Sequence, residues 1–420
     1  MDAADAGTAL GLEGQATRAW PTVEPGSWIR LDYPGVAHPV FLPDDQTFLA
    51  SLGAVVRGWH PRIGSADAGP AGHGAHSCIL PDGRDYTLYS THIDEPFTAL
   101  PMASAICAVV ADLAQSFIQQ RSDGLTLHCG ALSFGAGVIA LAGSARAGKS
   151  TLMARLSAEP DAHIFCDDML PVTADGQAMA LGIAPRLRLP LPDAASPGFR
   201  AHVRAHPGPA DDDYGYVIAP TIAAHGTVLP LRVLLLLDRR ERGPARLHRL
   251  NPGEAERGLL DHSMNGFAGP AAALDMVQRL ASGLVSARLV YSDIEDAVRA
   301  IRAAFGPQAS GDMRLEPPIA PQADQVAAAS PGTRFRRAGA ARSRRSPEGV
   351  FLWQPGDAGL WHLNPMAEAV WTMLEIPGSA RDLAQVLDDA WPEVPPERLL
   401  ADICGLLGQL AEAGLVVAQE

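Results

Sequence analysis

The residues best suited to chemistry lie in one short stretch, Gly143-Ser-Ala-Arg-Ala-Gly148-Lys149-Ser150-Thr151, which holds the only lysine of the 420-residue chain. Arginine can replace lysine on most surfaces, but not where a compact ammonium must fit between phosphate oxygens. The spacing follows the phosphate-binding loop pattern G-x-x-x-x-G-K-[ST]. The sequence therefore predicts a nucleoside triphosphate site made by Gly143, Ser144, Ala145, Arg146, Ala147, Gly148, Lys149, Ser150 and Thr151.

In such a loop the backbone N–H groups cradle phosphates, Lys149 reaches the bridging and terminal oxygens, and the Ser150 hydroxyl completes Mg²⁺ coordination. A second carboxylate is needed to hold that magnesium. Asp167 and Asp168 directly follow the apolar run His163–Cys166 and so lie at a strand end. Two adjacent carboxylates can divide the work, one supporting Mg²⁺ and the other accepting the proton of an incoming hydroxyl. We assign the metal to Ser150 and Asp168, while leaving open which aspartate is the base.

Buried strands and helices must position these groups. Residues 137–142 read as a buried strand before the loop and residues 150–156 as the first turns of a helix, whose N-terminus aims free N–H groups at an anion. Further strands are expected at 125–128, 163–166, 233–237 and 288–291, and further helices at 271–283 and 294–305. Mixed strands and helices at this spacing predict an α/β sheet covered by helices across residues 121–305.

The rest of the chain divides by composition. Residues 1–25 predict a flexible N-terminus, and residues 26–120 a β-rich region closed by an amphipathic helix. Residues 306–345 read as a flexible linker that ends in a basic stretch, Arg334–Arg337 and Arg342–Arg345. That stretch is either a solvated linker or edge strand, or a binding strip for an acidic peptide. Residues 346–420 predict a β-hairpin followed by three helices.

Net charge, cysteine content and the length of apolar runs argue against several classes of protein. The net charge of −14 argues against nucleic-acid binding. Five scattered cysteines favour a reducing compartment over a disulfide framework or zinc ribbon. We recognise no signal peptide and no apolar run of membrane-spanning length, so a cytoplasmic protein without a membrane partner is expected.

The order of the site residues resembles a known family. Leu127-His128-Cys-Gly-Ala-Leu, then the glycine loop, then Phe165-Cys-Asp167-Asp168 is similar to the catalytic domain of HPr serine kinase/phosphorylase, over about residues 120–305. The resemblance implies a P-loop kinase core that uses ATP and Mg²⁺, with GTP not excluded. It also implies that one of the two aspartates is the base on a substrate hydroxyl, and that His128 and Lys149 complete the catalytic set.

One departure from that family bears on the substrate. The bifunctional HPr enzymes carry a Glu-x-Arg-Gly-x-Gly stretch after the aspartates, and this chain has Met179-Ala-Leu-Gly-Ile-Ala-Pro-Arg186-Leu-Arg188 there. HPr as substrate and the reverse reaction are therefore not expected. Arg186 and Arg188 either clamp phosphates or flank a strand.

The C-terminal residues resemble a second family. Leu363-Asn364-Pro365-Met-Ala367-Glu-Ala-Val-Trp371 and the later helices are similar to PqqD-type peptide-recognition domains, across nearly all of residues 345–418. The resemblance implies a small winged-helix-like α+β domain that takes the leader of a ribosomally made precursor peptide as an added β-strand. In that mode main-chain hydrogen bonds give affinity and side-chain pockets give specificity.

Together these features predict an ATP- and Mg²⁺-dependent kinase for a Ser or Thr hydroxyl of a ribosomal precursor peptide, a lasso-peptide precursor being one candidate. A tethered recognition domain would raise the effective concentration of the peptide at the nucleotide site. Two alternatives stay open: a nucleotide-dependent peptide-binding chaperone or scaffold without phosphoryl transfer, and a small-molecule kinase with a regulatory tail. Homo-oligomerisation is left open as well.

Overall fold

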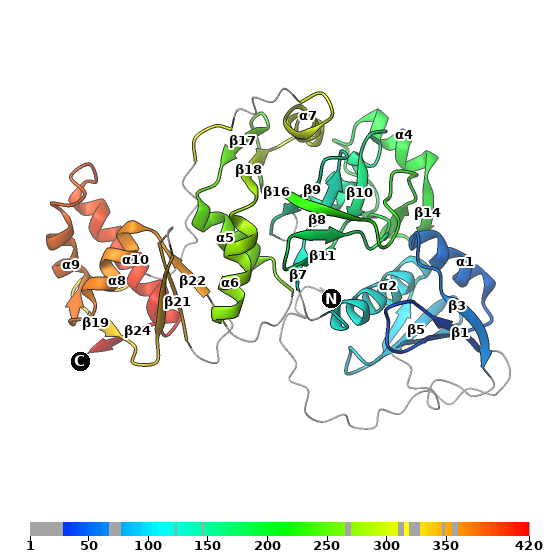
Figure 1. Ribbon diagram of the computed structural model, residues 1–420, viewed down its shortest axis with the longest axis horizontal. Helices are drawn as coiled ribbons and strands as arrows, with labels where there is room; N and C mark the ends of the chain where they lie inside the picture. Colours follow the sequence, from blue (N-terminus) through cyan, green and yellow to red (C-terminus); the bar gives the residue numbers. More distant parts are fainter. Residues whose placement is uncertain are drawn as a thin grey trace. The chain divides into compact units, whose positions relative to one another are not determined.

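The computed structural model describes residues 28–66, 77–121, 124–144, 147–264, 270–309, 315–318, 328–346, 349–354 and 360–419. The predicted flexible segment 1–25 and the turn at 355–359 lie outside these residues. Contacts divide the chain into two units, drawn in Figure 1. Unit 1 runs to Leu250 and takes in Asp261–Gly266 and Arg279–Pro317; unit 2 comprises Asn251–Leu260, Phe267–Gln278 and Pro318–Glu420.

The first part of unit 1 is a six-stranded sheet with two helices. The strand order is β3-β1-β2-β4-β5-β6, and the β2–β4 pair is parallel. Helix α1 (Gln46–Val55) begins at Asp45, whose carboxylate accepts from the amides of Thr47 and Phe48. The strands are β1 (Trp28–Asp32), β2 (Val40–Pro43), β3 (Arg62–Ala66), β4 (Ser77–Asp82), β5 (Asp85–Ser90) and β6 (Phe97–Leu100). The expected β-rich character is present, and α1 was not anticipated.

Helix α2 (Met102–Gln119) closes this region, as the apolar spacing predicted. By length and composition alone it could cross a membrane, but 61% of that 18-residue window is buried inside the protein. Its apolar face, including Ile106, Val109 and Leu113, belongs to a core shared with α1 and the sheet. We therefore read α2 as a core helix.

The second part of unit 1 is built on a nine-stranded sheet. The main path runs β10-β8-β9-β16-β12-β11-β7, with β18 parallel to β16 and β17 beyond it. Strands β9, β16 and β18 run parallel, while the flanking strands pair antiparallel. The members are β7 (Gly124–His128), β8 (Gly130–Ser133), β9 (Val138–Ala142), β10 (His163–Cys166), β11 (Met169–Thr173), β12 (Gln177–Met179), β16 (Val228–Arg239), β17 (Arg246–Arg249) and β18 (Val285–Tyr291).

The parallel strands form where the sequence is continuously apolar, because both of their faces are covered. Every residue of β9 is buried, as are Leu234 and Leu235 of β16. Helices α3 (Lys149–Leu156) and α7 (Ile294–Phe305) contribute to the same core. Beside it, β13 (Arg186–Arg188), β15 (Tyr214–Val217) and β14 (Pro207–Ala210) form a small sheet, with α4 (Pro197–Ala205) packed nearby.

Unit 2 contains two three-stranded sheets and a helical core. Their orders are β20-β21-β22 and β23-β19-β24. Val370, Trp371 and Leu407 lie at the centre of the buried cluster that joins the helices to both sheets. The elements are β19 (Arg334–Arg337), β20 (Arg342–Ser346), β21 (Gly349–Trp353), β22 (Leu360–Leu363), α8 (Pro365–Met373), β23 (Gly378–Ser379), α9 (Ala380–Leu387), α10 (Pro396–Glu412) and β24 (Val416–Gln419).

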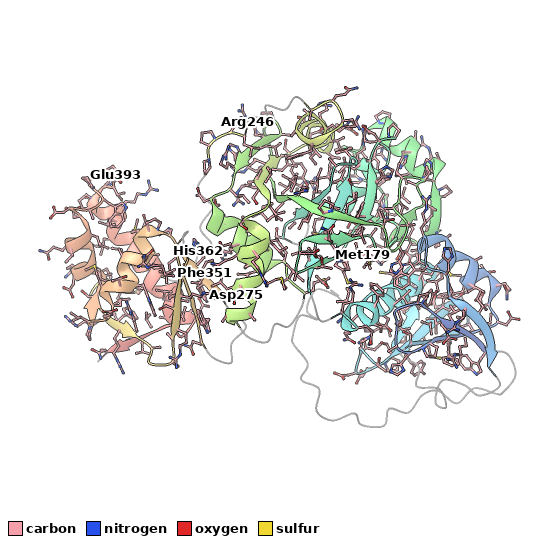
Figure 2. All side chains as sticks on the ribbon, viewed as in Figure 1. Met179, Arg246, Asp275, Phe351, His362 and Glu393 are labelled. Atoms are coloured by element: carbon pink, nitrogen blue, oxygen red, sulfur yellow. The ribbon has the colours of Figure 1, made fainter. Side chains whose placement is uncertain are left out.

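Two helices from the middle of the chain also belong to unit 2, namely most of α5 (Pro252–Asp261) and α6 (Pro270–Ala281). Arg344, Phe351 and His362 form a cross-strand row on one face of the β20-β21-β22 sheet. Asp275 of α6 pairs with Arg344 at 2.7 Å, and Phe351 and His362 lie against each other (Figure 2). A Cβ added to Gly253 of α5 would lie 2.2 Å from the His362 ring, so α5 packs directly on this face.

The structure differs from the predicted linker at 306–345. Its basic residues form β19 and β20, and β20 is an edge strand, as one of the two interpretations held. Arg337 donates to the Trp371 carbonyl at 2.8 Å and pairs with Glu375 at 3.0 Å, while Arg345 pairs with Glu368. These guanidinium groups bind the protein itself, which argues against a strip of free arginines for an acidic peptide.

Candidate functional site

The glycine loop connects β9 to α3, in the strand–loop–helix setting that the sequence predicted. Gly148 adopts φ +92°, and a Cβ there would lie 2.6 Å from the Tyr291 hydroxyl. That hydroxyl donates to the Ala147 carbonyl, so the end of β18 supports the loop. Ala145 and Arg146 lie outside the described residues. Only glycine satisfies both the left-handed backbone and the close approach at position 148.

Lys149 begins α3 and folds back over its own loop. Its Nζ donates to the Gly143 carbonyl at 2.7 Å and lies 3.4 Å from the Ser144 carbonyl. Burial lowers the pKa of Lys149, while Asp168, Cys129 and Asp167 act in the opposite sense. The single lysine thus lies among the predicted site groups rather than on an outer surface.

His128 and Asp168 form an ion pair at one end of two neighbouring strands. Strands β7 and β11 are antiparallel with Met169 opposite His128, which brings Asp168 beside the histidine. The His128 Nε2 atom lies 3.0 Å from the Asp168 Oδ1 atom, and the two side chains are 49% and 67% exposed. The pair is therefore accessible to a substrate, and His128 is held next to a carboxylate.

Asp167 has a different environment from its neighbour. It is only 9% exposed, its Oδ2 accepts from the Arg186 amide at 3.1 Å, and its Oδ1 has no partner. Burial raises the pKa of Asp167 to about 7; the Asp168 charge adds to this, and hydrogen bonds from the Arg186 amide and Ser150 oppose it. An isolated buried carboxyl prefers its neutral form because charge is poorly solvated there.

The two adjacent carboxyls shift in opposite directions. Burial acts to raise the pKa of Asp168 too, but His128, Lys149 and Arg186 outweigh it, and the net pKa is lowered. At neutral pH Asp168 is therefore ionised while Asp167 is close to its midpoint. Neighbouring groups whose environments drive their pKa values apart are typical of sites that divide acid and base roles.

Of the two arginines left open by the sequence, the structure brings one to the site. The Arg186 guanidinium lies 4.2 Å above the Tyr214 ring, and its charge acts on both Asp167 and Asp168. Arg188 is exposed at the end of β13, and its charge is not among the main influences on the pKa of either carboxyl. Arg186 can therefore serve as a guanidinium clamp, whereas Arg188 flanks a strand.

His262 also lies at this site, and sequence reasoning missed it. It follows α5 and is 94 residues from Asp168. Its carbonyl accepts from the His128 amide at 2.7 Å, and its imidazole is close enough to Lys149 and His128 for their charges to act on it. No spacing rule links it to the loop, so the sequence carries no signal that could have identified it.

The donor set suits a hard cation in part. The Asp167 Oδ1 atom is buried and unpartnered, and Ser150 lies close enough to Asp167 to act on its pKa, so these oxygens offer the kind of ligand that Mg²⁺ prefers. No cluster of three His, Cys, Asp or Glu side chains suited to a metal occurs within the described ranges. Mg²⁺ at nucleotide sites usually takes one or two protein ligands, the rest being phosphates and water. Ser150 and Asp168 stay the predicted metal ligands, and the unpartnered Oδ1 atom of Asp167 offers a further carboxylate oxygen for that role.

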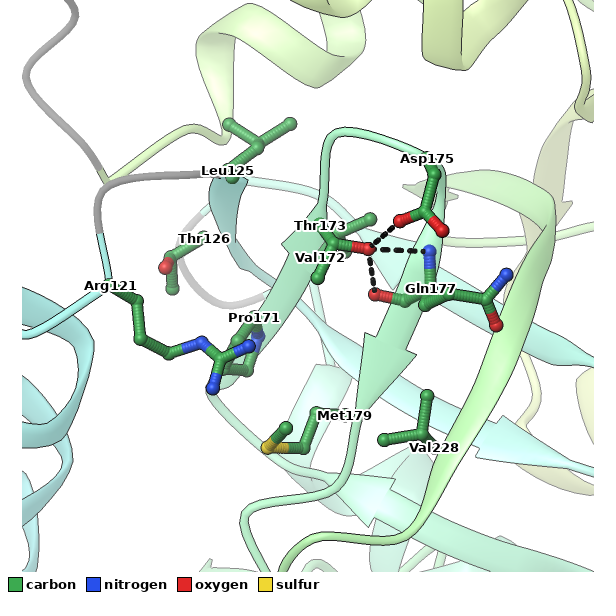
Figure 3. A pocket seen from close by; sticks show the side chains of 11 residues that line it. Arg121, Leu125, Thr126, Pro171, Val172, Thr173, Asp175, Gln177, Met179 and Val228 are labelled. Atoms are coloured by element: carbon green, nitrogen blue, oxygen red, sulfur yellow. Dashed lines mark hydrogen bonds between the residues drawn. The ribbon is translucent and has the colours of Figure 1, made fainter. Parts of the chain in front are cut away.

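A cavity of about 260 Å³ lies elsewhere in unit 1, at the far end of the β7–β11 pair (Figure 3). Gly124 and Thr173 are opposite each other there, four residues from His128, which corresponds to roughly 13 Å along the strand. Thr173 bonds to Asp175 and to the main chain of Gln177. None of the predicted site residues lines this cavity, so it is separate from the phosphate site.

Comparison with known proteins bears on the C-terminal part. Residues 349–416 match the family model "Coenzyme PQQ synthesis protein D (PqqD)". This confirms the predicted PqqD-like domain, and the match spans β21 to the first residue of β24. No curated protein matches the chain. The resemblance of residues 120–305 to HPr kinases stays a prediction.

Proposed function

We propose that this protein is an ATP- and Mg²⁺-dependent kinase acting on a Ser or Thr hydroxyl of a ribosomally made precursor peptide, which its PqqD-like domain recognises. The observation that carries the proposal is the convergence of Lys149, Asp167 and the His128–Asp168 pair around one glycine loop. Phosphoryl transfer needs positioning and electrostatic stabilisation of phosphate oxygens, together with a base near the attacking hydroxyl. These groups supply each of those functions.

The contacts suggest separate roles for the two aspartates. Asp168 is ionised, exposed and held by His128, so it can accept the proton of a substrate hydroxyl. As the hydroxyl oxygen bonds to the terminal phosphorus, the bond from that phosphorus to the leaving diphosphate breaks and the proton passes to Asp168. Asp167 and Ser150 would hold Mg²⁺, which neutralises phosphate charge when bound. Lys149 and Arg186 would stabilise the remaining negative charge.

The peptide would enter through unit 2. Strand β22 is an edge of the β20-β21-β22 sheet, so its outer main-chain groups are suited to pairing with an added strand. The β21–β22 hairpin lies inside the PqqD-matching range. A leader segment bound there would tether the rest of the peptide to the chain that carries the phosphate site and so raise its effective concentration.

Intact-mass spectrometry tests the proposal directly. Short peptides encoded beside this gene are co-expressed with the wild-type protein and with Lys149→Ala, Asp168→Asn and Asp193→Asn. Asp193 is exposed and is not one of the predicted site residues, so its variant is the matched control. We expect phosphorylated peptide with the wild type and with the Asp193→Asn control. The rate of phosphorylation should fall at least about 100-fold in Lys149→Ala and Asp168→Asn, because a catalytic base or a charge that stabilises the phosphates has been removed.

The alternatives give different results in the same experiment. A scaffold that binds nucleotide and peptide without transfer would retain peptide through unit 2 but leave its mass unchanged in every variant. A small-molecule kinase with a regulatory tail would hydrolyse or transfer phosphate without any peptide product. Either pattern would contradict the peptide-kinase proposal. A cytoplasmic location and the absence of a membrane partner stay predictions.

A further inference from the structure

Residues 262–264 pair with the edge strand β7 of the nine-stranded sheet through an isolated antiparallel bridge. The His128 amide donates to the His262 carbonyl at 2.7 Å, and the Met264 amide donates to the Thr126 carbonyl at 2.8 Å. Leu127 and Ser263 form the antiparallel bridge between these bonds. Because residues directly opposite in antiparallel strands share a face, His128 and His262 are cross-strand neighbours on the same face.

The His262 imidazole lies close to two basic side chains of the site. Burial, together with the nearby Lys149 and His128 charges, lowers its pKa to about 4. At neutral pH the ring is therefore uncharged. A neutral imidazole has one N–H donor and one acceptor nitrogen, so it can accept from an ammonium without opposing its charge.

We propose that His262 is a positioning residue of the phosphate site, whose side chain lies on the same sheet face as His128 and keeps the His128 ring turned toward Asp168. This inference rests on the proposed function, since His128 and Asp168 belong to the proposed transfer site. The position of His262 is fixed from two sides. The β7 main chain holds the residue in register, and α5 ends at the preceding residue, Asp261. His262 thereby limits the space in which the His128 ring can turn away from Asp168.

A purely structural role would depend on the backbone alone. In that case any side chain at position 262 that preserves the strand would serve equally well. Ser263 provides the matched control, because it shares the same strand pairing while its side chain points to the opposite face. Its hydroxyl is buried without a partner, so Ser263→Ala removes no hydrogen bond.

The only lysine of the chain gives a readout that is independent of activity. Protein labelled with ¹³C at the lysine ε-carbon shows one signal, which belongs to Lys149. At one fixed pH we expect this signal to move in His262→Ala and to stay in place in Ser263→Ala. His262→Gln retains a donor and an acceptor and should move it less. Circular dichroism checks that each variant is folded, and His262→Gln keeps the test valid if His262→Ala does not fold.

Kinetics complete the test. We expect His262→Ala to lower kcat for peptide phosphorylation about 10-fold to 100-fold with a small change in KM, because positioning acts in the transition state. His262→Gln should recover part of that loss, and Ser263→Ala should match the wild type. If His262→Ala matches Ser263→Ala in both kcat and the lysine signal, the inference is overturned. If the wild type transfers no phosphoryl group, the kinase proposal fails, and the lysine signal alone supports or overturns the position of His262 beside Lys149.

Discussion

Replacing Asp167 by asparagine should make the stability of the protein less dependent on pH. The pKa of Asp167 is raised from 3.8 to about 7, mainly because the carboxyl is buried. A folded-state pKa above the unfolded value means that the folded state binds the proton more tightly. The carboxyl therefore favours folding at low pH, and this contribution is lost as the pH rises from about 4 towards 7.

The size of this change in stability follows from the pKa shift of Asp167. About three pKa units correspond to roughly 4 kcal/mol, of which roughly 3 kcal/mol falls between pH 5 and pH 8.5. Asparagine has no charge to bury, but its amide N–H₂ would meet a position where the Oδ1 atom has no partner. That unsatisfied donor costs about 1–3 kcal/mol at every pH. At pH 8.5 the variant should therefore be more stable than the wild type by about 1–3 kcal/mol.

Urea unfolding measures this difference. Both proteins are unfolded at pH 5 and pH 8.5 in EDTA and without nucleotide, followed by tryptophan fluorescence, with Asp193→Asn as the exposed control. The free energy of unfolding of the variant relative to wild type should rise by roughly 3 kcal/mol between the two pH values. Equal differences at both pH values would refute the reasoning, because burial would then not be the cause. Asp168→Asn should show no such change between pH 5 and pH 8.5, because the pKa of Asp168 is lowered and the carboxyl is ionised in the folded and unfolded states throughout that range.

Three further substitutions test what individual glycines contribute to the backbone and to packing. Gly148→Ala should abolish nucleotide binding, measured by calorimetry, and destabilise the protein by at least about 1–2 kcal/mol, because φ is +92° and a Cβ would lie 2.6 Å from the Tyr291 hydroxyl. Gly253→Ala should loosen the packing of α5 on His362, seen as faster hydrogen exchange of β21, because a Cβ would lie 2.2 Å from that ring. Gly405→Ala in α10 meets no atom within 4 Å and should stabilise the helix by about 0.5–1 kcal/mol. Unchanged exchange in Gly253→Ala would show that α5 does not pack on β22.

Much of the secondary structure follows from local patterns. The apolar runs at 125–128, 163–166 and 233–237 are strands, and the amphipathic spacing at 294–305 is a helix. The strand–loop–helix around Lys149 is present because an apolar run, two glycines and a helix-forming segment are adjacent in the chain. The short strands β8, β12 and β13 were missed, because three or four residues carry too little periodicity to be recognised.

The linker prediction shows the limit of composition. Residues 334–346 are polar and lack periodicity, yet they form β19 and β20. These strands exist because β23, β24 and β21 provide pairing partners, and because the arginines find carboxylates and carbonyls on unit 2. Pairing of this kind depends on residues distant in the chain, which a local window does not contain.

Residue order alone indicated which groups could form a site: one lysine in a phosphate-binding loop pattern, two adjacent carboxylates after a strand, a histidine before the loop, and a PqqD-like C-terminal domain. The tertiary structure decided which of these groups meet. The antiparallel register of β7 and β11 paired His128 with Asp168 and left Asp167 buried. Tertiary packing also brought His262 to the same sheet edge, and it placed α5 on the β20-β21-β22 sheet. The physical reason is that burial and strand register set a carboxyl's pKa and its neighbours, and both are properties of packed elements rather than of residue order.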